Sequence, residues 1–531
     1  MKKFFFMPLI ITVSLLLSCR HNGAFDPITE IPSYTEPTPE TYSITVTQSA
    51  GGTVTVSPAK DTYQKNETVH LNAVPDSTCK LQAWNQATGE RALSWDLKVT
   101  KNENISAVFV KRAWTFLLYM AADNDLESAA IQDLNEIEAA DIDGKPIDIL
   151  ALLDRGPGQD STNGDWTDTR LYHVCADPGG LNSMIVSPRL ACPKLGITDS
   201  GNAELNMGDP MVLDFLLSSV KESFPAENYC LIFWGHGTGW RSSAASITNA
   251  LPPLKAMAFD DTSKDYMTIT EAAHAMKDKG LNVTCFDTCF GALLEIAYEM
   301  RLPVSRYLVG SAGAVPSAGW NYTDLFDTFV RTDLSASSFG ETAIAQFRDQ
   351  YEGIPGSTIS LIDLSKTLQL RNDFENFART VADAVTTASA RARIRSLVLK
   401  ECDLYRANTF PCDTFIDASS LAEKIRDNRN LISASLAVQT SILDSSNALS
   451  ASVSAAVLSC WSQEAEGKKR IGVNLIGFIA PSIPQSSHDP SYVRGSGATD
   501  QSDFVRTSFG WVPTHDAEGS FLDKIFYFEN F

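Results

Sequence analysis

Residues 229–240 read YCLIFWGHGTGW, a short apolar run that passes directly into a glycine-rich turn. A nearly continuous apolar run of this length is typical of a strand that is covered on both faces, as in a parallel sheet. The glycines on either side of His236 let the backbone turn sharply at the end of that strand. We therefore expect His236 to lie at the rim of a sheet with little cover, where the backbone can come near a ligand.

Similar apolar runs precede and follow this stretch, and most are followed by residues at helical spacing. After the run over 114–120, residues 126–137 have the helical period, with Asp123 and Asp125 placed to cap the helix. Such alternation implies right-handed crossovers and a doubly wound, mostly parallel α/β sheet, whose sites gather at the carboxyl ends of the strands. Residues 154–207 are too long for a simple connection and are expected to hold an inserted hairpin and a functional loop. Further strands are predicted over 147–153, 281–286 and 307–311, and helices over 211–224, 269–279 and 292–301.

The predicted strand over 281–286 runs into Asp287-Thr288-Cys289-Phe290-Gly291, and a helix is expected to follow. A cysteine at such a junction lies near the helix N-terminus, whose amide dipoles favour the thiolate. Taken alone, Cys289 is consistent with small packing, and His236 with an ordinary loop histidine. Their joint placement at the ends of consecutive predicted strands instead indicates a nucleophile and a base that meet across the edge of the sheet. No second Cys/His cluster at metal-ligand spacing lies near either one.

Four segments in order carry a family resemblance: 114–125 (WTFLLYMAADND), 229–240 (YCLIFWGHGTGW), 286–300 (FDTCFGALLEIAYEM) and 309–322 (VGSAGAVPSAGWNY). Together they make residues 113–330 similar to the clostripain family of cysteine peptidases, which has a caspase-like fold. The resemblance implies that His236 is the catalytic histidine and Cys289 the nucleophile. It also implies that Asp287, two residues before the nucleophile, receives a basic side chain at the P1 position of a protein or peptide substrate.

In the reaction that the resemblance implies, the Cys289 thiolate attacks the scissile carbonyl to form an acyl-enzyme, and His236 protonates the leaving amine. The backbone N–H groups of Cys289 and Gly237 would stabilise the oxyanion. Ser311 matches a serine of the family pocket, but the acidic residue that follows it in many relatives is replaced here by Ala312. Asp287 alone is then left to hold a basic P1 side chain. Since it lies before a predicted helix, it is equally suited to capping that helix.

Two further family properties bear on this chain. Members are often matured by self-cleavage in a loop after the catalytic histidine, where this chain carries Arg241 and Lys255. Clostripain itself depends on calcium, so the resemblance admits Ca²⁺ as a cofactor, although the dyad requires none. The chain has no EF-hand loop. The acid-rich loop over 160–168 offers carboxylates for an ion, and it is also explained as an ordinary solvated loop.

The first residues have the pattern of a bacterial lipoprotein signal. Two lysines precede an apolar stretch over 4–17, and LLSC at residues 16–19 resembles a lipobox. We expect a signal peptide over 1–18 and lipid on Cys19, which would anchor the protein to the membrane. The alternative is a plain secretory signal in which Cys19 has no role. The prediction is a cell-envelope lipoprotein of the outer membrane of a Gram-negative bacterium.

Two regions flank the predicted catalytic domain, which we assign to residues 112–355. A Pro/Thr-rich tether over 19–41 leads into a small all-β module over 42–111, which resembles the internalin-type B-repeat, a spacer or adhesion unit. Residues 356–531 are predicted as a mixed, mainly helical C-terminal α+β region that packs on the catalytic domain and helps to shape its cleft. The strands expected in the module are 42–47 and 53–56, joined by Gly51-Gly52, then 68–74 and 105–110; the C-terminal region has expected helices over 361–397 and a strand over 473–480.

Composition agrees with an exported globular protein. The chain has 531 residues, of which 44% are hydrophobic, enough for about two to four domains with real cores. With 43 Lys and Arg against 64 Asp and Glu, the net charge of −21 argues against nucleic acid as a partner. Of the 10 cysteines, Cys175/Cys192 and Cys402/Cys412 could form disulfides, or they are small buried hydrophobes. The two functions to distinguish are a membrane-anchored cysteine endopeptidase and a non-catalytic binding lipoprotein that retains the fold.

Overall fold

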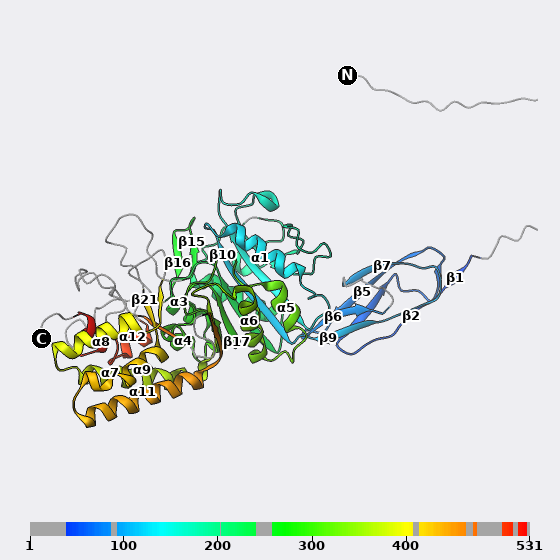
Figure 1. Ribbon diagram of the computed structural model, residues 1–531. Coiled ribbons are helices and arrows are strands. Elements are labelled where there is room, and N and C mark those ends of the chain that lie inside the picture. The colour runs from blue at the N-terminus through cyan, green and yellow to red at the C-terminus, as the bar shows by residue number, and fades with distance from the viewer. Residues whose placement is uncertain are drawn as a thin grey trace, which may run out of the picture.

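The computed structural model describes residues 39–85, 93–201, 203–239, 257–406, 414–463, 471–474, 502–512 and 519–527. Along the chain these residues form a small β module, a large sheet with helices on both faces, and a helical C-terminal part (Figure 1). The expectations for the signal peptide and Cys19, for Arg241 and Lys255, and for the Cys402/Cys412 pair fall wholly or partly outside the described residues.

The large sheet has nine strands in the order β13-β12-β11-β10-β14-β17-β18-β19-β22. Its five central strands are parallel, as predicted from their apolar runs, and they are largely buried on both faces. Antiparallel strands close both edges. The parallel strands are β10 (Trp114–Ala122), β11 (Ile147–Arg155), β14 (Asn228–Trp234), β17 (Leu281–Asp287) and β18 (Ser305–Gly310); the others are β12 (Thr169–His173), β13 (Arg189–Leu190), β19 (Thr358–Asp363) and β22 (Val457–Ser462).

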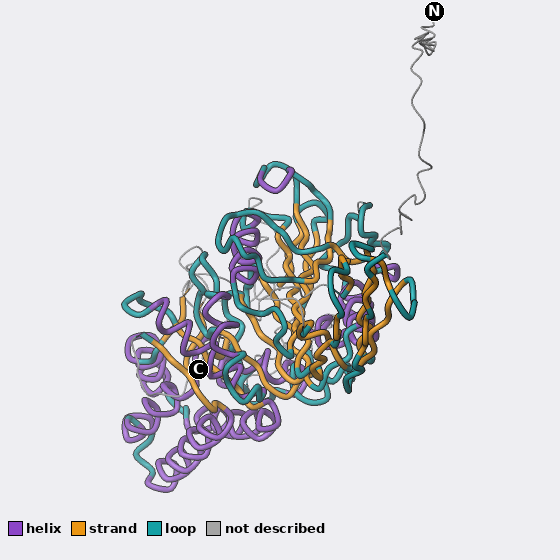
Figure 2. The backbone as a smooth tube through the Cα atoms, turned by 90° about the vertical axis from the view of Figure 1, so that its right-hand side faces the viewer, coloured by secondary structure: helices purple, strands orange, loops and turns teal. Residues whose placement is uncertain are grey.

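Helices cover both faces of this sheet, and alternate residues of each strand enter one core or the other (Figures 1 and 2). On β10, for example, Leu117 and Tyr119 pack with α2, α3 and α4, whereas Phe116 and Leu118 pack with α1, α5 and α6. The first face is covered by α2 (Pro210–Ser223), α3 (Ile269–Met276), α4 (Leu294–Glu299) and α7 (Thr367–Ala384), and the second by α1 (Glu127–Ala139), α5 (Tyr322–Phe329) and α6 (Ala336–Tyr351).

The order of the parallel strands marks one place on the sheet. When the five parallel strands are numbered by their order along the chain, their order across the sheet is 2-1-3-4-5. The connection after β10 therefore runs toward one edge of the sheet, and the connection after β14 runs toward the other edge. In open α/β sheets, ligands bind outside the carboxyl ends of the strands at such a switch point. The segments that meet there are the turn after β10, the turn after β14, and the hairpin of β15 (Met257–Asp260) and β16 (Asp265–Met267).

The β module has its own small core, which includes Val69, Leu71 and Trp84. The predicted strands are present, but those on either side of Gly51-Gly52 do not pair with each other, because β2 pairs with β8 and β3 with β5. The strands are β1 (Thr41–Tyr42), β2 (Ile44–Val46), β3 (Gly52–Ser57), β4 (Tyr63–Gln64), β5 (Thr68–Pro75), β6 (Cys79–Trp84), β7 (Ser94–Lys98), β8 (Glu103–Ile105) and β9 (Ala107–Lys111).

A buried charge cluster joins the module to the large sheet. Asp148 on β11 receives hydrogen bonds from Lys80 of the module at 2.8 Å, from His173 at 3.0 Å, and from Arg112 in the connection. Burial alone would raise the pKa of Asp148, but His173 and Lys80 hold it well below its usual range.

The C-terminal part is mainly helical, as expected, but the sheet continues past the predicted boundary at 355/356. Residues 358–363 form β19, so the predicted run of helices from 361 was wrong at its start; β19 pairs antiparallel with β18.

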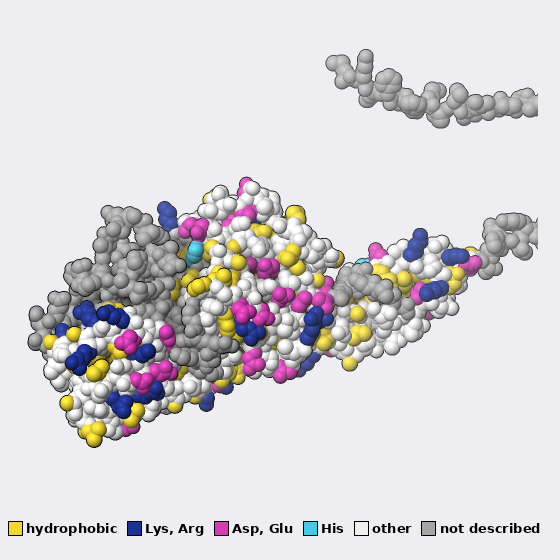
Figure 3. Space-filling view, viewed as in Figure 1, with side chains coloured by type: hydrophobic (Ala, Val, Ile, Leu, Met, Phe, Trp, Pro, Cys, Tyr) yellow, Lys and Arg dark blue, Asp and Glu magenta, His cyan; other side chains and the backbone are white. Residues whose placement is uncertain are grey.

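Basic side chains gather over the helical C-terminal part at the lower left of Figure 3, among acidic ones. Its elements are α8 (Ala388–Glu401), β20 (Leu404–Arg406), β21 (Thr414–Asp417), α9 (Ala418–Asp427), α10 (Arg429–Ile432), α11 (Leu436–Ala456), β23 (Gly472–Asn474), α12 (Asp503–Thr507) and a π-helical turn over Asp523–Tyr527.

Of the two alternatives for Cys175 and Cys192, the disulfide is absent, and both residues are free thiols. Cys192 is buried in the core on one face of the sheet, whereas Cys175 is only partly buried and donates its N–H to the Ser187 hydroxyl. Among the described residues, no helix combines the length and the apolar character that a membrane crossing needs.

Candidate active site

His236 and Cys289 lie at the carboxyl ends of the neighbouring strands β14 and β17. Trp234 at the end of β14 pairs with Asp287 at the end of β17, so the two turns leave the sheet at the same level. A Cβ added to Gly237 would lie 2.5 Å from the Cys289 carbonyl oxygen, closer than real Cβ atoms approach. Glycine at this position therefore lets the turn that carries His236 pack directly against the turn that carries Cys289.

The Cys289 thiol is half-buried beneath the loop that follows β18. The N–H of Val315 donates to Sγ at 3.4 Å, and Sγ–H donates to the Val315 carbonyl oxygen at 3.8 Å. Burial raises the pKa of the Cys289 thiol. Because α4 begins only at Leu294, the predicted stabilisation of a thiolate by a helix N-terminus was wrong. The next residue, Phe290, has a φ of 59°, so the thiol sits beside a strained backbone position of a kind that clusters at functional sites.

His236 has an acidic partner that sequence reasoning assigned elsewhere. Its Nε2–H donates to Asp125 Oδ1 at 2.6 Å, which leaves Nδ1 as the basic nitrogen of the ring. Asp125 lies in the turn after β10, the strand that neighbours β14. The predicted role of Asp123 and Asp125 as caps of α1 was wrong, because the N-cap is Leu126 and no side chain caps the helix. His236 and Asp125 are exposed by 43% and 76%, so their contact orients the ring more than it adds stability.

Asp287 is not a helix cap. Its Oδ2 accepts hydrogen bonds from the Trp320 N–H at 3.1 Å and the Tyr322 hydroxyl at 2.9 Å, both from the segment that follows β18. Its Oδ1 is buried without a hydrogen-bond partner. Burial raises the pKa of Asp287 to about 7, so the site holds a carboxyl that lacks a cation. The cap alternative is excluded, and an unpaired acceptor remains beside the nucleophile's turn.

A second carboxyl, which sequence reasoning missed, lies beside Asp287. A Cβ added to Gly319 would lie 2.9 Å from Asp133 Oδ2 and 3.0 Å from Asp287 Oδ2, so the two oxygens flank one point. Asp133 is on α1, accepts from the Trp234 indole N–H at 2.6 Å, and has a pKa raised by burial and by Asp287. Ser311 is buried, and its hydroxyl bonds, among the described residues, to the backbone of Gly313 in its own turn.

Two sets of acidic residues offer carboxylates to a metal ion. In the predicted 160–168 loop, Asp160 accepts from Thr162 and contacts Arg155, and Asp168 accepts from Arg170, so these carboxylates already have protein partners. A different group at the switch point has four carboxylates with ligand atoms all within 4.8 Å of one another: Asp123, Asp154, Glu204 and Asp260.

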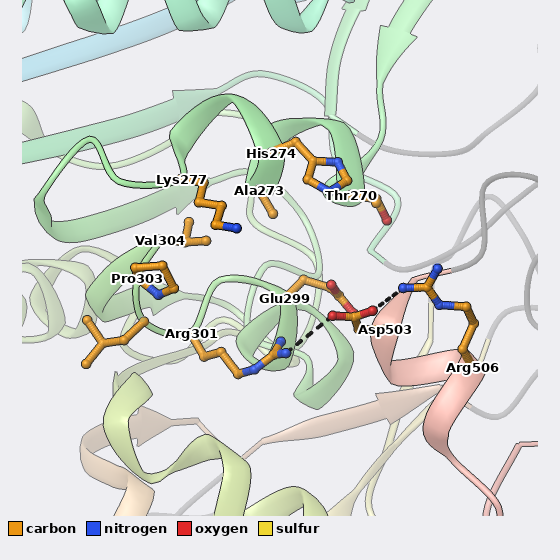
Figure 4. Close-up of a pocket in the computed structure, with 11 residues that line it drawn as sticks. Thr270, Ala273, His274, Lys277, Glu299, Arg301, Pro303, Val304, Asp503 and Arg506 are labelled. Carbon is orange, nitrogen blue, oxygen red and sulfur yellow. Dashed lines mark hydrogen bonds and ion pairs between the residues drawn. The ribbon is translucent and has the colours of Figure 1, made fainter.

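A separate pocket of about 310 Å³ lies at the other end of α4, away from Cys289 (Figure 4). It contains an ion-pair chain in which Asp503 contacts both Arg301 and Arg506. Glu299 is buried beside it and accepts from the Phe504 N–H at 2.8 Å. Burial raises the pKa of Glu299 to about 7. The lining of the pocket contains no cysteine, and we assign the pocket no catalytic role.

Glu299→Gln is expected to flatten the pH dependence of stability. Because the folded protein holds the Glu299 proton more tightly than the unfolded chain does, stability present below about pH 4.5 is lost as the pH rises toward 7. The loss amounts to at most roughly 3 to 4 kcal/mol, at about 1.4 kcal/mol for each pKa unit. Thermal unfolding at pH 5 and pH 8 measures it. Glu341→Gln, at an exposed position on α6, is the control; equal pH dependence in both variants would contradict the prediction.

The comparisons with known proteins agree with this geometry. Residues 118–480 match the model of the clostripain family, and residues 42–113 match that of the divergent InlB B-repeat domain. Clostripain of Hathewaya histolytica is 24% identical over 363 residues, which cover 60% of this chain and 66% of that protein. The X-ray structure of an inactive zymogen C11 protease from Parabacteroides distasonis superposes with a TM-score of 0.50 at 16% identity, covering 70% of this chain and 95% of that one. A secreted C11 cysteine protease from Bacteroides thetaiotaomicron gives a TM-score of 0.45 at 19% identity, covering 69% and 90%.

A mostly parallel sheet between two helical layers, with its candidate residues at the strand ends of a switch point, is the caspase-like fold that was predicted. The family match spans more than half of the sequence, and the chain belongs to the clostripain family, whose structurally characterised members are cysteine proteases. The chain spans 66% of the length of the curated clostripain that it matches.

Proposed function

We propose that this protein is a cysteine endopeptidase that cleaves peptide bonds after Arg or Lys, held at the bacterial outer membrane by lipid on Cys19. The observation that carries the proposal is the contact between the turns of His236 and Cys289 at the ends of β14 and β17. Membership of the clostripain family supports the peptidase chemistry. The lipobox-like residues 16–19 support the anchor, and the β module would act as a spacer between membrane and enzyme.

The reaction begins with a neutral thiol, because burial raises the pKa of Cys289. His236 takes the Sγ proton at Nδ1, Sγ bonds to the scissile carbonyl carbon, and the resulting imidazolium is stabilised by Asp125. The C–N bond then breaks as His236 returns the proton to the leaving amine. Water hydrolyses the thioester and restores the thiol. The N–H groups of Gly237 and Cys289 would hold the oxyanion, each worth about 3–4 kcal/mol.

Specificity for a basic P1 side chain rests on the two buried carboxyls. The unpaired Oδ1 of Asp287 lacks a donor, and a guanidinium or ammonium would supply one. Asp133 places a second carboxyl beside it, and we infer that this group takes the place of the acidic residue that many relatives have at position 312. The alternative function is a non-catalytic lipoprotein in which the β module, with its own core, binds a partner.

A panel of fluorogenic peptides tests the proposal. Under reducing conditions, substrates with Arg or Lys at P1 are expected to be cleaved about a hundredfold faster than those with Ala or Asp, measured as kcat/KM. Iodoacetamide that alkylates Cys289, located by peptide mass spectrometry, should abolish turnover. Absence of turnover with all four substrates, with and without calcium, would favour the binding lipoprotein instead.

A further inference from the structure

The pocket at the far end of α4 lies where three elements meet. Its walls come from α3, from the turn that follows α4, and from α12 of the C-terminal part (Figure 4). Its volume of about 310 Å³ lies at the lower end of the range for small-molecule sites. Asp503 on α12 contacts Arg301, which follows α4, at 3.4 Å, so an ion pair already links the two parts of the chain here. A molecule bound in the pocket would touch both parts.

Basic side chains outnumber acidic ones in the lining of this pocket. Lys277, just past the end of α3, extends into the pocket and has no acidic partner among the described residues (Figure 4). His274, in the last turn of α3, is exposed and has none in that part of the chain either. Asp503 is shared by two cations, Arg301 and Arg506, so this group of three keeps one positive charge. The chain as a whole has a net charge of −21, and this local excess of positive charge therefore marks a place that attracts anions.

Glu299, at the end of α4, does not cancel this positive charge in mildly acidic solution. The residue is 8% exposed, and its Oε1 accepts from the Phe504 N–H at 2.8 Å. Burial raises the pKa of Glu299 to about 7, so the carboxyl is mostly protonated at pH 6. At that pH, Lys277 and the arginine that Asp503 does not neutralise line the pocket without a counterion from the described residues.

The rest of the lining selects the class of anion. Pro303 and Val304 form an apolar wall on the side away from Asp503 (Figure 4), and Leu302 beside them is 52% exposed. Inorganic phosphate would leave this wall bare. A carboxylate carries a single charge, and an apolar group attached to it would cover the wall. We propose that the pocket binds a small carboxylate with an apolar body, either a free organic acid or the C-terminus of a peptide, and that Lys277 and Arg301 hold the carboxylate.

A ligand-detected NMR titration of the full-length chain at pH 6 tests the site. Cys289→Ala serves as the parent, so that self-cleavage cannot interfere. Two carboxylates with the same apolar group are the probes: N-acetyl-leucine resembles a peptide C-terminus, and 4-methylpentanoate is a free acid. At least one of them is expected to bind with a Kd of about 1 mM or lower. N-acetyl-leucinamide, which lacks the charge, and acetate, which lacks the apolar group, should bind at least about tenfold more weakly.

Substitutions of Lys277 locate the binding. Lys277→Met removes the ammonium group at an exposed helix end but keeps the length of the side chain, and should raise the Kd of the bound probe at least about tenfold. Lys277→Arg retains a cationic donor and should keep most of the affinity. Lys98→Met, at an exposed position on β7 of the β module, is the matched control and should bind as the parent does.

The outcomes decide both the site and the ligand. If neither carboxylate binds, or if Lys277→Met binds as tightly as Lys98→Met, the site is overturned. Inorganic phosphate that binds as tightly as the better probe would overturn the choice of a carboxylate with an apolar body. Tighter binding of N-acetyl-leucine would support a peptide C-terminus as the natural ligand, and tighter binding of 4-methylpentanoate would support a free acid. None of these measurements involves turnover, so the site stands or falls independently of the proposed peptidase function.

Discussion

Cys289→Ala is expected to lower kcat/KM on an Arg-P1 peptide by at least about 10⁴-fold, because no other side chain can form the thioester. His236→Ala removes the group that takes the Sγ proton and protonates the leaving amine, and should lower kcat about 10²- to 10⁴-fold. Burial raises the pKa of the Cys289 thiol, so little thiolate is present without the imidazole. The loss of kcat in His236→Ala should therefore lie toward the upper end of this range. Initial rates under reducing conditions measure both effects.

Cys175→Ala is the matched control for the nucleophile. Cys175 is also a partly buried free thiol, but it lies beyond β12, away from the switch point, and should retain full activity. Thermal unfolding of each variant excludes loss of the fold as the cause. Activity of Cys289→Ala within tenfold of wild type would contradict the dyad, and equal losses in Cys175→Ala would indicate a structural effect.

The central fold was predictable because its strands are nearly continuous apolar runs followed by helical periods. The same pattern brought His236 and Cys289 to one edge: each follows a buried strand, and the carboxyl ends of neighbouring parallel strands meet. The strands β19 and β22 were not recognised as part of this sheet. They return to it antiparallel after long helical stretches, so their register depends on packing between distant segments.

The missed site residues share one cause. Asp125 lies 111 positions from His236 in the sequence, and the local pattern assigned it to capping a helix. Asp133 lies 101 positions from Trp234, whose indole N–H it accepts, and no local pattern singled it out. The strand order 2-1-3-4-5, which could have drawn attention to the turn after β10, follows from pairing and not from any single stretch. The acidic group that contains Asp154 and Glu204 could not be predicted either, because its members are widely spaced in the sequence and meet only in the folded sheet.

The surroundings of Cys289 also correct a chemical expectation. A cysteine just before a helix was expected to gain from the helix dipole, but four residues separate Cys289 from Leu294, where α4 begins, and the effect falls off within about one turn. What acts on the sulfur instead is the cover from Val315. Because burial raises the pKa of the thiol, a thiolate forms when His236 takes the proton, so its formation is part of the proposed reaction and not a property of the resting protein.

Asp287→Asn is expected to abolish the preference for basic P1 residues while making the protein more stable at high pH. The buried carboxyl lies among Asp133, Glu136 and Tyr322, with no cation to offset its charge, and its pKa is raised to about 7. The ionised form that accepts a guanidinium therefore grows as the pH rises through 7. The ratio of kcat/KM for Arg-P1 to Ala-P1 peptides should rise over this range in the wild type, because the dyad contributes equally to both rates.

In Asp287→Asn, that ratio should fall about 10²-fold at pH 8 and lose its pH dependence, since a neutral amide cannot pair with the P1 cation. The same substitution that weakens the P1 preference should raise the stability of the protein at high pH. Wild-type stability is lost as the pH rises from about 3.8 toward 7, because the folded state binds the Asp287 proton more tightly than the unfolded chain does, whereas the variant has no proton to lose. Its thermal midpoint should exceed that of the wild type at pH 8 and not at pH 4. A variant that keeps the Arg-P1 preference would remove Asp287 from the pocket, and a variant less stable than wild type at pH 8 would show that the carboxylate has a cationic partner.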